Sequence, residues 1–318
     1  MNAQPLTLAN LDITDTGLYV RDGYPWAAWD LLRRDAPVFW YERPHHEPFW
    51  AITKHEDIGF ISRSPELFSN TQLLRMSDTE SIQMGQRGRV RAANRFGGSP
   101  EDPPDFIFLD PPEHSQHRSL VSKHFTPRMM RALEDHFGHM AENYVSHFAY
   151  VLAKDLAAKG SEEAVDAVHE LSAKLPVAAI CEMAGVPEED WDKIFHWTET
   201  LVGAADPEYQ LPGENREQTL RRNGEEWRLY NEALVKKRRA DGLGDDMLSS
   251  LLKAEVDGRE LNAREISAYF TILLAAGNET TRNSITGGIK ALIENPDQLQ
   301  LLIDNPELVP SAVEKILR

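Results

Sequence analysis

The sequence has a single cysteine, Cys181, among its 318 residues. One thiol excludes an internal disulfide framework and any metal site built from several cysteines. Long apolar runs are also missing, since no uninterrupted stretch is long enough to span a bilayer. The first residues, MNAQPLTLANLDITD, lack the basic segment and the following apolar segment of a secretory signal. We therefore expect a cytoplasmic protein that does not associate with membranes.

Positive charge is scarce relative to negative charge. Lys and Arg number 34 and Asp and Glu number 51, which gives a formal net charge of −17. This balance argues against broad electrostatic binding to nucleic acid or anionic lipid. The run KKRR at 236–239 closes an expected helix, where cations offset the helix dipole, so we assign no binding site to it. Hydrophobic residues make up 41% of the chain, an ordinary share for a globular protein that buries a core.

Hydrophobic periodicity and turn residues predict a mainly α-helical protein with a small β-element near its N-terminus. The β-element is a hairpin of residues 38–41 and 49–53, flanked by helices over 24–36 and 54–62. From residue 113 onward the pattern predicts helices over 113–124, 127–154, 165–184, 188–202, 216–239, 245–255, 263–294, 296–305 and 309–318. Residues 71–105 are rich in Gly, Ser, Arg and Pro, and we interpret them as a long loop that forms a lid, a binding loop or a mobile insert.

The segment 263–294 is the most informative of these helices. Its apolar stripe begins with Ile266, Tyr269, Phe270 and Leu273, but its centre reads AAGNETTRNS at 275–284. Gly costs a helix about 1 kcal/mol relative to Ala, and Asn and Thr are poor helix formers as well. Steps of three and four from Leu273 lead to Gly277 and then to Thr280, so a glycine and a hydroxyl occupy expected core positions.

Two explanations of this segment remain open. In the first, Gly277 allows close helix packing and Thr280 bonds back to the preceding turn. In the second, a flat and bulky ligand lies against the glycine face, and Glu279 and Thr280 relay protons into an otherwise apolar pocket. A carboxylate and a hydroxyl in such a pocket are costly unless they are hydrogen-bonded or hydrated.

A second group of polar residues lies in LDPPEHSQHRSLVSKHFTPR, residues 109–128. His114 and Arg118 are four residues apart and share one face of the expected helix. Two donors on one face suit a carboxylate or a phosphate. The alternatives are a metal site of His114, His117 and His124, for which no HExxH motif or supporting carboxylate is evident, and an ordinary solvated helix face. Cys181 lies among apolar residues in LPVAAICEMAGVP, which indicates a buried core position.

Taken together, these segments resemble the cytochrome P450 superfamily of haem-thiolate monooxygenases in its soluble bacterial form. AGNETT at 276–281 looks like the family's central oxygen-activating helix, and DPPEHSQHR at 110–118 looks like the stretch whose His and Arg contact the haem propionates. The runs 168–191 and 245–255 and the last helices also fit in order and spacing. The resemblance implies one mainly α domain over 1–318 with the cytochrome P450 fold.

The resemblance also assigns roles to individual residues. Glu279 and Thr280 would be the acid and alcohol that deliver protons during oxygen activation, and Ala276 and Gly277 would border the oxygen pocket. His114 and Arg118 would hold the propionates of haem b. The implied reaction inserts one oxygen atom of O2 into a small apolar substrate, such as a sterol side chain, a terpenoid or a branched lipid. Because the sequence has no dinucleotide fingerprint, electrons would come from a ferredoxin-type donor with its reductase.

The sequence departs from the family pattern at two places. The family's ligand cysteine lies in a loop near the C-terminus, whereas Cys181 belongs to a different segment, so we do not assign it as the iron ligand. We expect the chain to be an N-terminal fragment that is inactive alone. Lys315 stands where the family has the Glu of a Glu-x-x-Arg pair ending at Arg318, and Glu314 is a substitute on the same face. The alternative function is a non-catalytic helical ligand-binding or scaffold protein derived from this fold.

Overall fold

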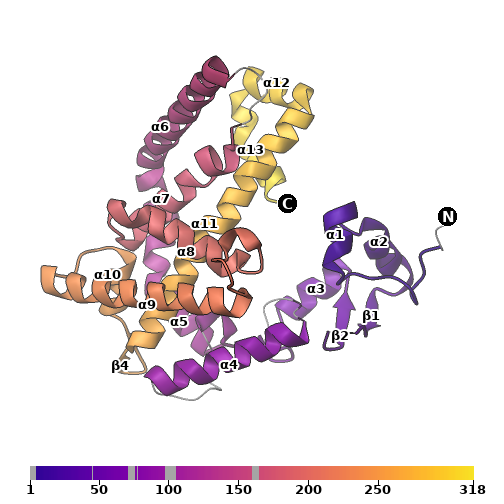
Figure 1. Cartoon of the computed structure of the whole chain (residues 1–318), viewed down its shortest axis with the longest axis horizontal. Coiled ribbons are helices and arrows are strands. Elements are labelled where there is room, and N and C mark those ends of the chain that lie inside the picture. Colours follow the sequence, from indigo (N-terminus) through magenta and orange to yellow (C-terminus); the bar gives the residue numbers. More distant parts are fainter. Residues whose placement is uncertain (1–4, 45, 71–75, 77, 97–104, 160–164) are drawn as a thin grey trace. The chain divides into compact units, whose positions relative to one another are not determined.

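The computed structural model describes residues 5–44, 46–70, 76, 78–96, 105–159 and 165–318, and it is mainly α-helical (Figure 1). The chain divides into two compact units, Met1–His117 and Arg118–Arg318, and each is described by itself. The predicted fold class, helices with a small β-element near the N-terminus, is confirmed.

The first unit contains the hairpin and several short helices. Its elements are α1 (Thr16–Asp22), α2 (Trp26–Asp35), β1 (Val38–Tyr41), β2 (Phe49–Ile52), α3 (His55–Ser62), α4 (Thr79–Phe96) and the 3₁₀ turn η1 (Phe106–Phe108), and α5 (Glu113–Ser122) crosses the boundary to the second unit. Strands β1 and β2 pair antiparallel, with Trp40 opposite Trp50. The hairpin and the helices predicted on either side of it are confirmed, whereas α1 was not predicted.

The core of the first unit is organised around Tyr41. Its side chain is fully buried, and its hydroxyl donates to Asp12 Oδ1 at 2.8 Å and accepts from the Ile13 N–H at 3.2 Å. Both polar capacities of the phenol are used, so the ring can be buried without an unpaired group. The remaining core residues are Leu11, Ile13, Ala28, Leu31, Leu32 and Ala51.

The predicted loop over 71–105 is wrong for residues 79–96, which form α4. Asp78 Oδ1 accepts from the Ser81 N–H at 2.6 Å, which caps the first turn. The two glycines of the segment favoured the prediction of a loop, although the segment also contains several Gln, Arg and Ala residues, which favour helix. The other parts of the predicted loop, 71–75, 77 and 97–104, lie outside the described residues.

The second unit is built from long helices. Its elements are η2 (Lys123–Phe125), α6 (Pro127–Lys159), the π-helical turn η3 (Val168–Ser172), α7 (Lys174–Ala184), η4 (Glu188–Asp190), α8 (Trp191–Gly203), η5 (Pro207–Tyr209), α9 (Arg216–Asp241), α10 (Met247–Leu252), β3 (Glu255–Val256), β4 (Arg259–Glu260), α11 (Ala263–Glu294), α12 (Pro296–Asp304), η6 (Pro306–Leu308) and α13 (Val309–Ile316). Most of the predicted helices are confirmed with small changes at their ends. The helix predicted over 165–184 is wrong in its first part, where residues 168–172 form a π-helical turn and α7 begins only at Lys174. The helix predicted over 245–255 ends at Leu252, before β3. The two-residue strands β3 and β4 were not predicted.

Helix α11 runs through the middle of the second unit, and α7 and α8 pack against it (Figure 1). It begins with a capping box: Asn262 Oδ1 accepts from the Glu265 N–H at 2.9 Å, and Glu265 Oε2 accepts from the Asn262 N–H at 2.8 Å. This reciprocal pair satisfies two donors that a helix start otherwise leaves open. The helix ends at Asn295–Pro296, as predicted.

The turn after α7 is fixed by a glycine and an arginine. Gly185 has φ +82°, a conformation that disfavours other residues, and Arg238 at the end of α9 donates to its carbonyl at 2.6 Å. Arg238 also pairs with Asp246 Oδ2 at 2.8 Å, at the start of α10. One residue of the KKRR run therefore joins three elements, in addition to its effect on the helix dipole.

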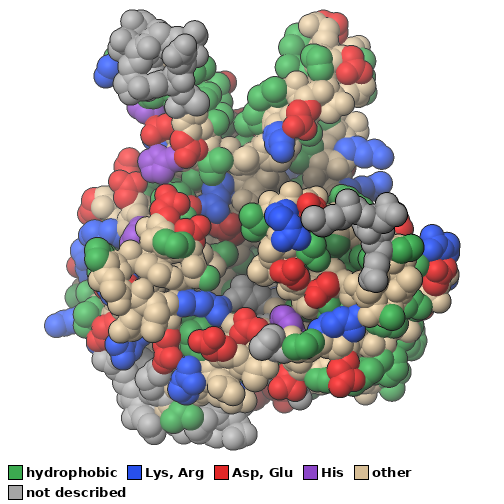
Figure 2. All heavy atoms as spheres, turned by 45° about the vertical axis from the view of Figure 1, so that its right-hand side comes forward, with side chains coloured by type: hydrophobic (Ala, Val, Ile, Leu, Met, Phe, Trp, Pro, Cys, Tyr) green, Lys and Arg blue, Asp and Glu red, His purple; other side chains and the backbone are tan. Residues whose placement is uncertain are grey.

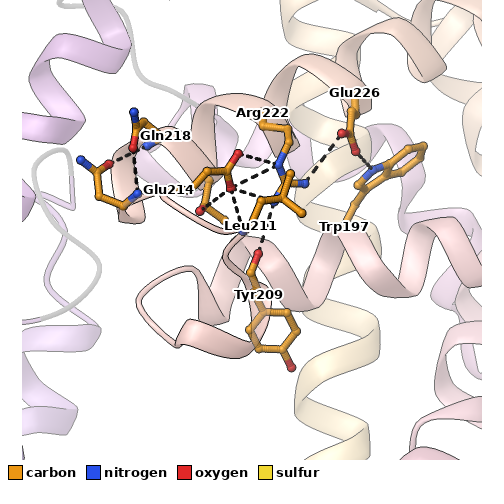
Figure 3. Close-up of polar contacts among 9 residues, drawn as sticks. Trp197, Tyr209, Leu211, Glu214, Gln218, Arg222 and Glu226 are labelled. Carbon is orange, nitrogen blue, oxygen red and sulfur yellow. Dashed lines mark hydrogen bonds and ion pairs between the residues drawn. The ribbon is translucent and has the colours of Figure 1, made fainter.

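The connection between α8 and α9 is held by a cluster of polar contacts (Figure 3). Arg222 Nε donates to Glu214 Oε1 at 3.0 Å, and its Nη2 donates to the Tyr209 carbonyl at 3.3 Å. Hydrogen bonding to Arg222 lowers the pKa of Glu214 to about 2. Arg222 also lies 3.7 Å from Glu226, which accepts from Trp197 Nε1 at 3.0 Å. We call the Glu214–Arg222 pair with the Tyr209 carbonyl the connection clamp.

Acidic and basic side chains are intermingled on the face that Figure 2 shows. Within the described ranges, no helix is both long enough and apolar enough to cross a bilayer.

Candidate active site

The central turns of α11 have one buried and one exposed face. Ala276, Thr280, Asn283 and Gly287 are exposed and follow one another at helical spacing. Asn278 is buried on another side of the same turns. The exposed face therefore carries only small side chains, against which a flat group can lie closely.

Gly277 faces helix α7. A Cβ atom at position 277 would lie 2.7 Å from Ile180 Cγ1, closer than Cβ atoms approach their neighbours in folded proteins. Close helix packing, the first of the two explanations that the sequence leaves open, is therefore what the structure shows at this glycine.

Thr280 is exposed, so its expected position on the core stripe is wrong. The stripe follows four-residue steps through Ile266, Phe270, Leu274 and Asn278, all buried, and this path leaves Thr280 on another face. The hydroxyl Oγ1 donates to the Ala276 carbonyl at 2.7 Å. This bond fixes the hydroxyl against the helix, next to the small exposed face.

Asn278 is a site residue that the sequence analysis missed. It is 0% exposed, and its Nδ2 donates to Thr198 Oγ1 on α8 at 3.0 Å. The Nδ2 bond joins the motif to a neighbouring helix, whereas Oδ1 of the same amide is buried without a hydrogen-bond partner among the described residues. An unpaired buried oxygen is costly, so the amide is only partly compensated. The four-residue spacing from Phe270 and Leu274 was the signal that could have identified it.

Glu279 takes part in an ion network. Its Oε1 accepts from Arg282 Nη2 at 2.6 Å and from Asn283 Nδ2 at 3.1 Å. Arg282 Nη1 also pairs with Glu199 Oε1 on α8. Burial raises the pKa of Glu199, Arg282 opposes this rise, and Glu279 adds to it. Neither Arg282 nor Glu199 was identified from the sequence.

His114 and Arg118 both lie on α5, four residues apart. The His114 ring is half-buried and stacks on Phe106, with 6.1 Å between the ring centroids. Arg118 is exposed, and its charge lies near Tyr269 of α11. Burial raises the pKa of Tyr269 to about 12, and Arg118 opposes this rise.

The two other histidines of the alternative metal site have different contacts. His117 Nδ1 is 2.9 Å from the Glu113 carbonyl, and His124 Nε2 is 2.8 Å from Ser250 Oγ. Burial lowers the pKa of His124. Within the part of the chain that the structure describes, no group of three or more His, Cys, Asp or Glu side chains is placed to hold a metal ion.

A small cavity lies among α8, α9 and α11. Its volume is about 70 Å³, and Trp197, Thr198 and Trp227 are among its lining residues. Pockets for drug-sized ligands measure roughly 300–1,000 Å³, so this cavity is too small for a terpenoid or a lipid.

The comparison with known proteins decides the family. No family model matches the chain. A protein named as a cytochrome P450 in Mycobacterium tuberculosis is 35% identical over 327 residues, which cover 98% of this chain and 70% of that protein. The chain belongs to the cytochrome P450 family. P450 enzymes of this family are haem-dependent monooxygenases, so the predicted enzyme class and cofactor, haem b, are confirmed.

Two further P450 relatives and one solved P450 structure are similar over most of the chain. The methyl-branched lipid omega-hydroxylase of Mycobacterium tuberculosis is 36% identical over 320 residues, 98% of this chain and 67% of the relative. Linalool 8-monooxygenase of Pseudomonas putida is 31% identical over 96% of this chain and 70% of its own length. A Mycobacterium marinum cytochrome P450 in complex with pseudoionone has a TM-score of 0.76 at 28% identity, over 96% of this chain and 69% of that one.

Haem is a flat ring system that carries two carboxylates, and the chemistry of the residue types present here suits such a group. The small side chains Ala276 and Thr280 leave room for a flat ring system, and His114 and Arg118 are the donor types that bind carboxylates. Cys181 does not fit as the thiolate ligand. It is 0% exposed within α7, and burial raises the pKa of its thiol.

Proposed function

We propose that this P450 inserts one oxygen atom of O2 into an apolar, branched substrate of the terpenoid, sterol side-chain or branched-lipid class. The observation that carries the proposal is the central turn of α11, where the hydroxyl of Thr280 and the carboxylate of Glu279 adjoin an exposed face of small side chains. A proton donor and a space for a flat cofactor are thereby combined in the same turns of one helix.

Haem, when bound, supplies oxygen activation and electron transfer, and the protein supplies orientation, protons and exclusion of water. His114 and Arg118 would hold the propionate carboxylates through charge-assisted hydrogen bonds. Ala276 would keep the space above the ring open, and Gly277 would border that space through its backbone. Thr280 Oγ1 would hold a proton at the edge of this space, and Glu279 would replenish it.

The substrate class is supported by the relatives, whose names refer to methyl-branched lipids, a steroid C26 position and linalool. These compounds share branched apolar chains, although they differ in size and head group. We further propose that a ferredoxin-type protein with its reductase supplies the electrons, because the sequence lacks a dinucleotide-binding motif of its own.

The test uses the haem-loaded protein with a surrogate ferredoxin and ferredoxin reductase. Linalool, a methyl-branched fatty acid and a sterol ketone are each supplied with NADPH, and hydroxylated product and peroxide are measured. We expect product from at least one compound, and we expect Thr280→Ala to release several times more peroxide per NADPH consumed. Thr271→Ala is the matched control, because Thr271 lies on the same helix and its hydroxyl also bonds to a carbonyl four residues back, at 2.7 Å.

Two results would contradict the proposal. Compounds that bind and never yield product would favour a non-catalytic ligand-binding protein, the alternative derived from the same fold. An unchanged peroxide ratio in Thr280→Ala, together with lowered stability, would assign Thr280 a packing role only.

A further inference from the structure

Arg282 on α11 is shared between two carboxylates that come from two helices. Its Nη2 donates to Glu279 Oε1 at 2.6 Å, and its Nη1 pairs with Glu199 Oε1 on α8. The side chains are only 12% exposed for Arg282, 17% for Glu199 and 21% for Glu279. The cluster therefore combines two acidic groups and one basic group where water is largely excluded.

This charge balance makes the two glutamates competitors for one guanidinium. Loss of either carboxylate leaves the other in a one-to-one pair with Arg282, whereas loss of both leaves a buried cation without its partners. Arg282 cannot resolve the imbalance by losing its proton, since a guanidinium stays charged in proteins. The remaining titratable groups near Glu199 are His169 on η3, which favours the ionised carboxylate, and Tyr209 on η5.

The orientation of Glu279 is set from two sides. Arg282 and Asn283 donate to the same oxygen of its carboxylate, at 2.6 and 3.1 Å. Arg282 is itself anchored on α8 by Glu199, and Asn283 belongs to the exposed face that also carries Thr280.

We propose that Glu199 and Arg282 are positioning residues for Glu279, so that α8 sets the orientation of the acid in AGNETT. The inference rests on the proposed role of Glu279 as the acid. It adds that Glu199, on a different helix and far earlier in the sequence, controls this acid through a shared arginine.

The first test is a double-mutant cycle measured by urea unfolding of the full chain at pH 7.5. Glu199→Gln and Glu279→Gln are each expected to have a small effect, because the remaining carboxylate then pairs fully with Arg282. The double variant should raise the unfolding constant at least tenfold beyond the product of the two single effects. This excess should disappear in an Arg282→Gln background, which lacks the shared cation.

A matched cycle is available on α9. Arg228 is also shared by two glutamates, Glu225 at 2.8 Å and Glu232 at 2.5 Å, but the side chains of these glutamates are 42% and 52% exposed. Its cycle should be additive within about twofold, because exposed pairs contribute little. Additive behaviour in the Glu199–Glu279 cycle would overturn the proposal.

The second test is the pH profile of peroxide release by the haem-loaded protein. Glu199→Gln gives Arg282 wholly to Glu279 and so should move the profile's midpoint to lower pH by about one unit. Glu199→Asp keeps a carboxylate at this position, so its midpoint should lie between those of Glu199→Gln and the parent protein. Glu232→Gln should leave the midpoint in place. An unmoved midpoint in Glu199→Gln, when Glu279→Gln itself raises peroxide, would overturn the proposal. If Glu279→Gln leaves peroxide unchanged, the proposed function fails instead, and the unfolding cycle decides the positioning separately.

Discussion

Ile180 on α7 fills the space that a side chain at position 277 of α11 would need. A Cβ at Gly277 would lie 2.7 Å from Ile180 Cγ1 and 2.9 Å from its Cδ1. The two helices therefore approach more closely here than any residue other than glycine permits. The close approach fixes the turn of α11 that carries Glu279 and Thr280 against the body of the second unit.

Gly277→Ala should destabilise the protein by about 1–3 kcal/mol, the usual cost of overfilling a packed site. Ile180→Ala creates a cavity, but combining the two changes should cost less than the sum of the single effects. Gly138→Ala is the control, since a Cβ at this position on α6 would have no neighbour within 4 Å and alanine favours helix. Urea unfolding gives all four values, and additive effects would show that Ile180 is not the obstacle.

Arg118→Ala should speed haem loss from the loaded protein about 10- to 100-fold, because a hydrogen bond to a charged group contributes about 1.5–3 kcal/mol. His114→Ala should act in the same direction but more weakly, since a neutral imidazole donates without a full charge. His117→Ala should have no effect, because its ring bonds to the Glu113 carbonyl. Transfer of haem to apomyoglobin measures each rate. Equal loss from the His117 and Arg118 variants would refute the propionate assignment.

Asp105→Asn should stabilise the protein at pH 8 by about 1 kcal/mol and leave stability unchanged near pH 3.5, below the ordinary aspartate pKa, in keeping with a partly solvated carboxyl. Burial raises the pKa of Asp105 to about 6, while the Ile107 N–H, which donates to it at 3.0 Å, opposes the rise. A raised pKa in the folded state favours the protonated form, so the contribution of Asp105 is fully present at low pH and is lost as pH rises through about 6.

Asp206→Asn supplies the control for this pH dependence. Asp206 accepts from the Glu208 N–H at 3.0 Å in the same local geometry, but it is exposed. Thermal unfolding of both variants between about pH 3.5 and 8 is the measurement. A pH-independent difference between Asp105→Asn and the parent protein would contradict the expectation.

Arg222→Lys should open the connection clamp, because a lysine cannot reproduce the forked contacts of a guanidinium. Loss of these contacts should speed amide exchange across residues 204–215 about tenfold, most clearly at Leu211, whose N–H donates to Glu214 Oε2 at 3.2 Å. The lowered pKa of Glu214, about 2, means that the clamp's contribution persists at pH 5 and is lost as pH falls toward 2. Arg228→Lys on the same helix should leave exchange in this segment unchanged.

The fold was largely predictable from local signals, whereas much of the site was not. Helix α11 begins and ends where Asn262, Glu265 and Pro296 predict, since caps and prolines act over a few residues. Helix α4 was missed because its glycines outweighed the cap at Asp78. The Arg282–Glu199 pair joins residues 83 positions apart, and no periodicity reports such a contact. The burial of Asn278 could have been predicted, because this residue continues the four-residue spacing of the buried residues Phe270 and Leu274.

The two faces of the central turns of α11 also determine where the protein can be altered by directed evolution. Ala276, Asn283 and Gly287 are exposed, so libraries at these positions would vary the shape of the site without first disturbing the core. Gly277 packs against α7 and Asn278 bonds to α8. Libraries at these two positions would therefore yield mostly unfolded protein. Within a span of about three turns, one helix thus separates the positions open to selection for new substrates from those that selection must leave alone.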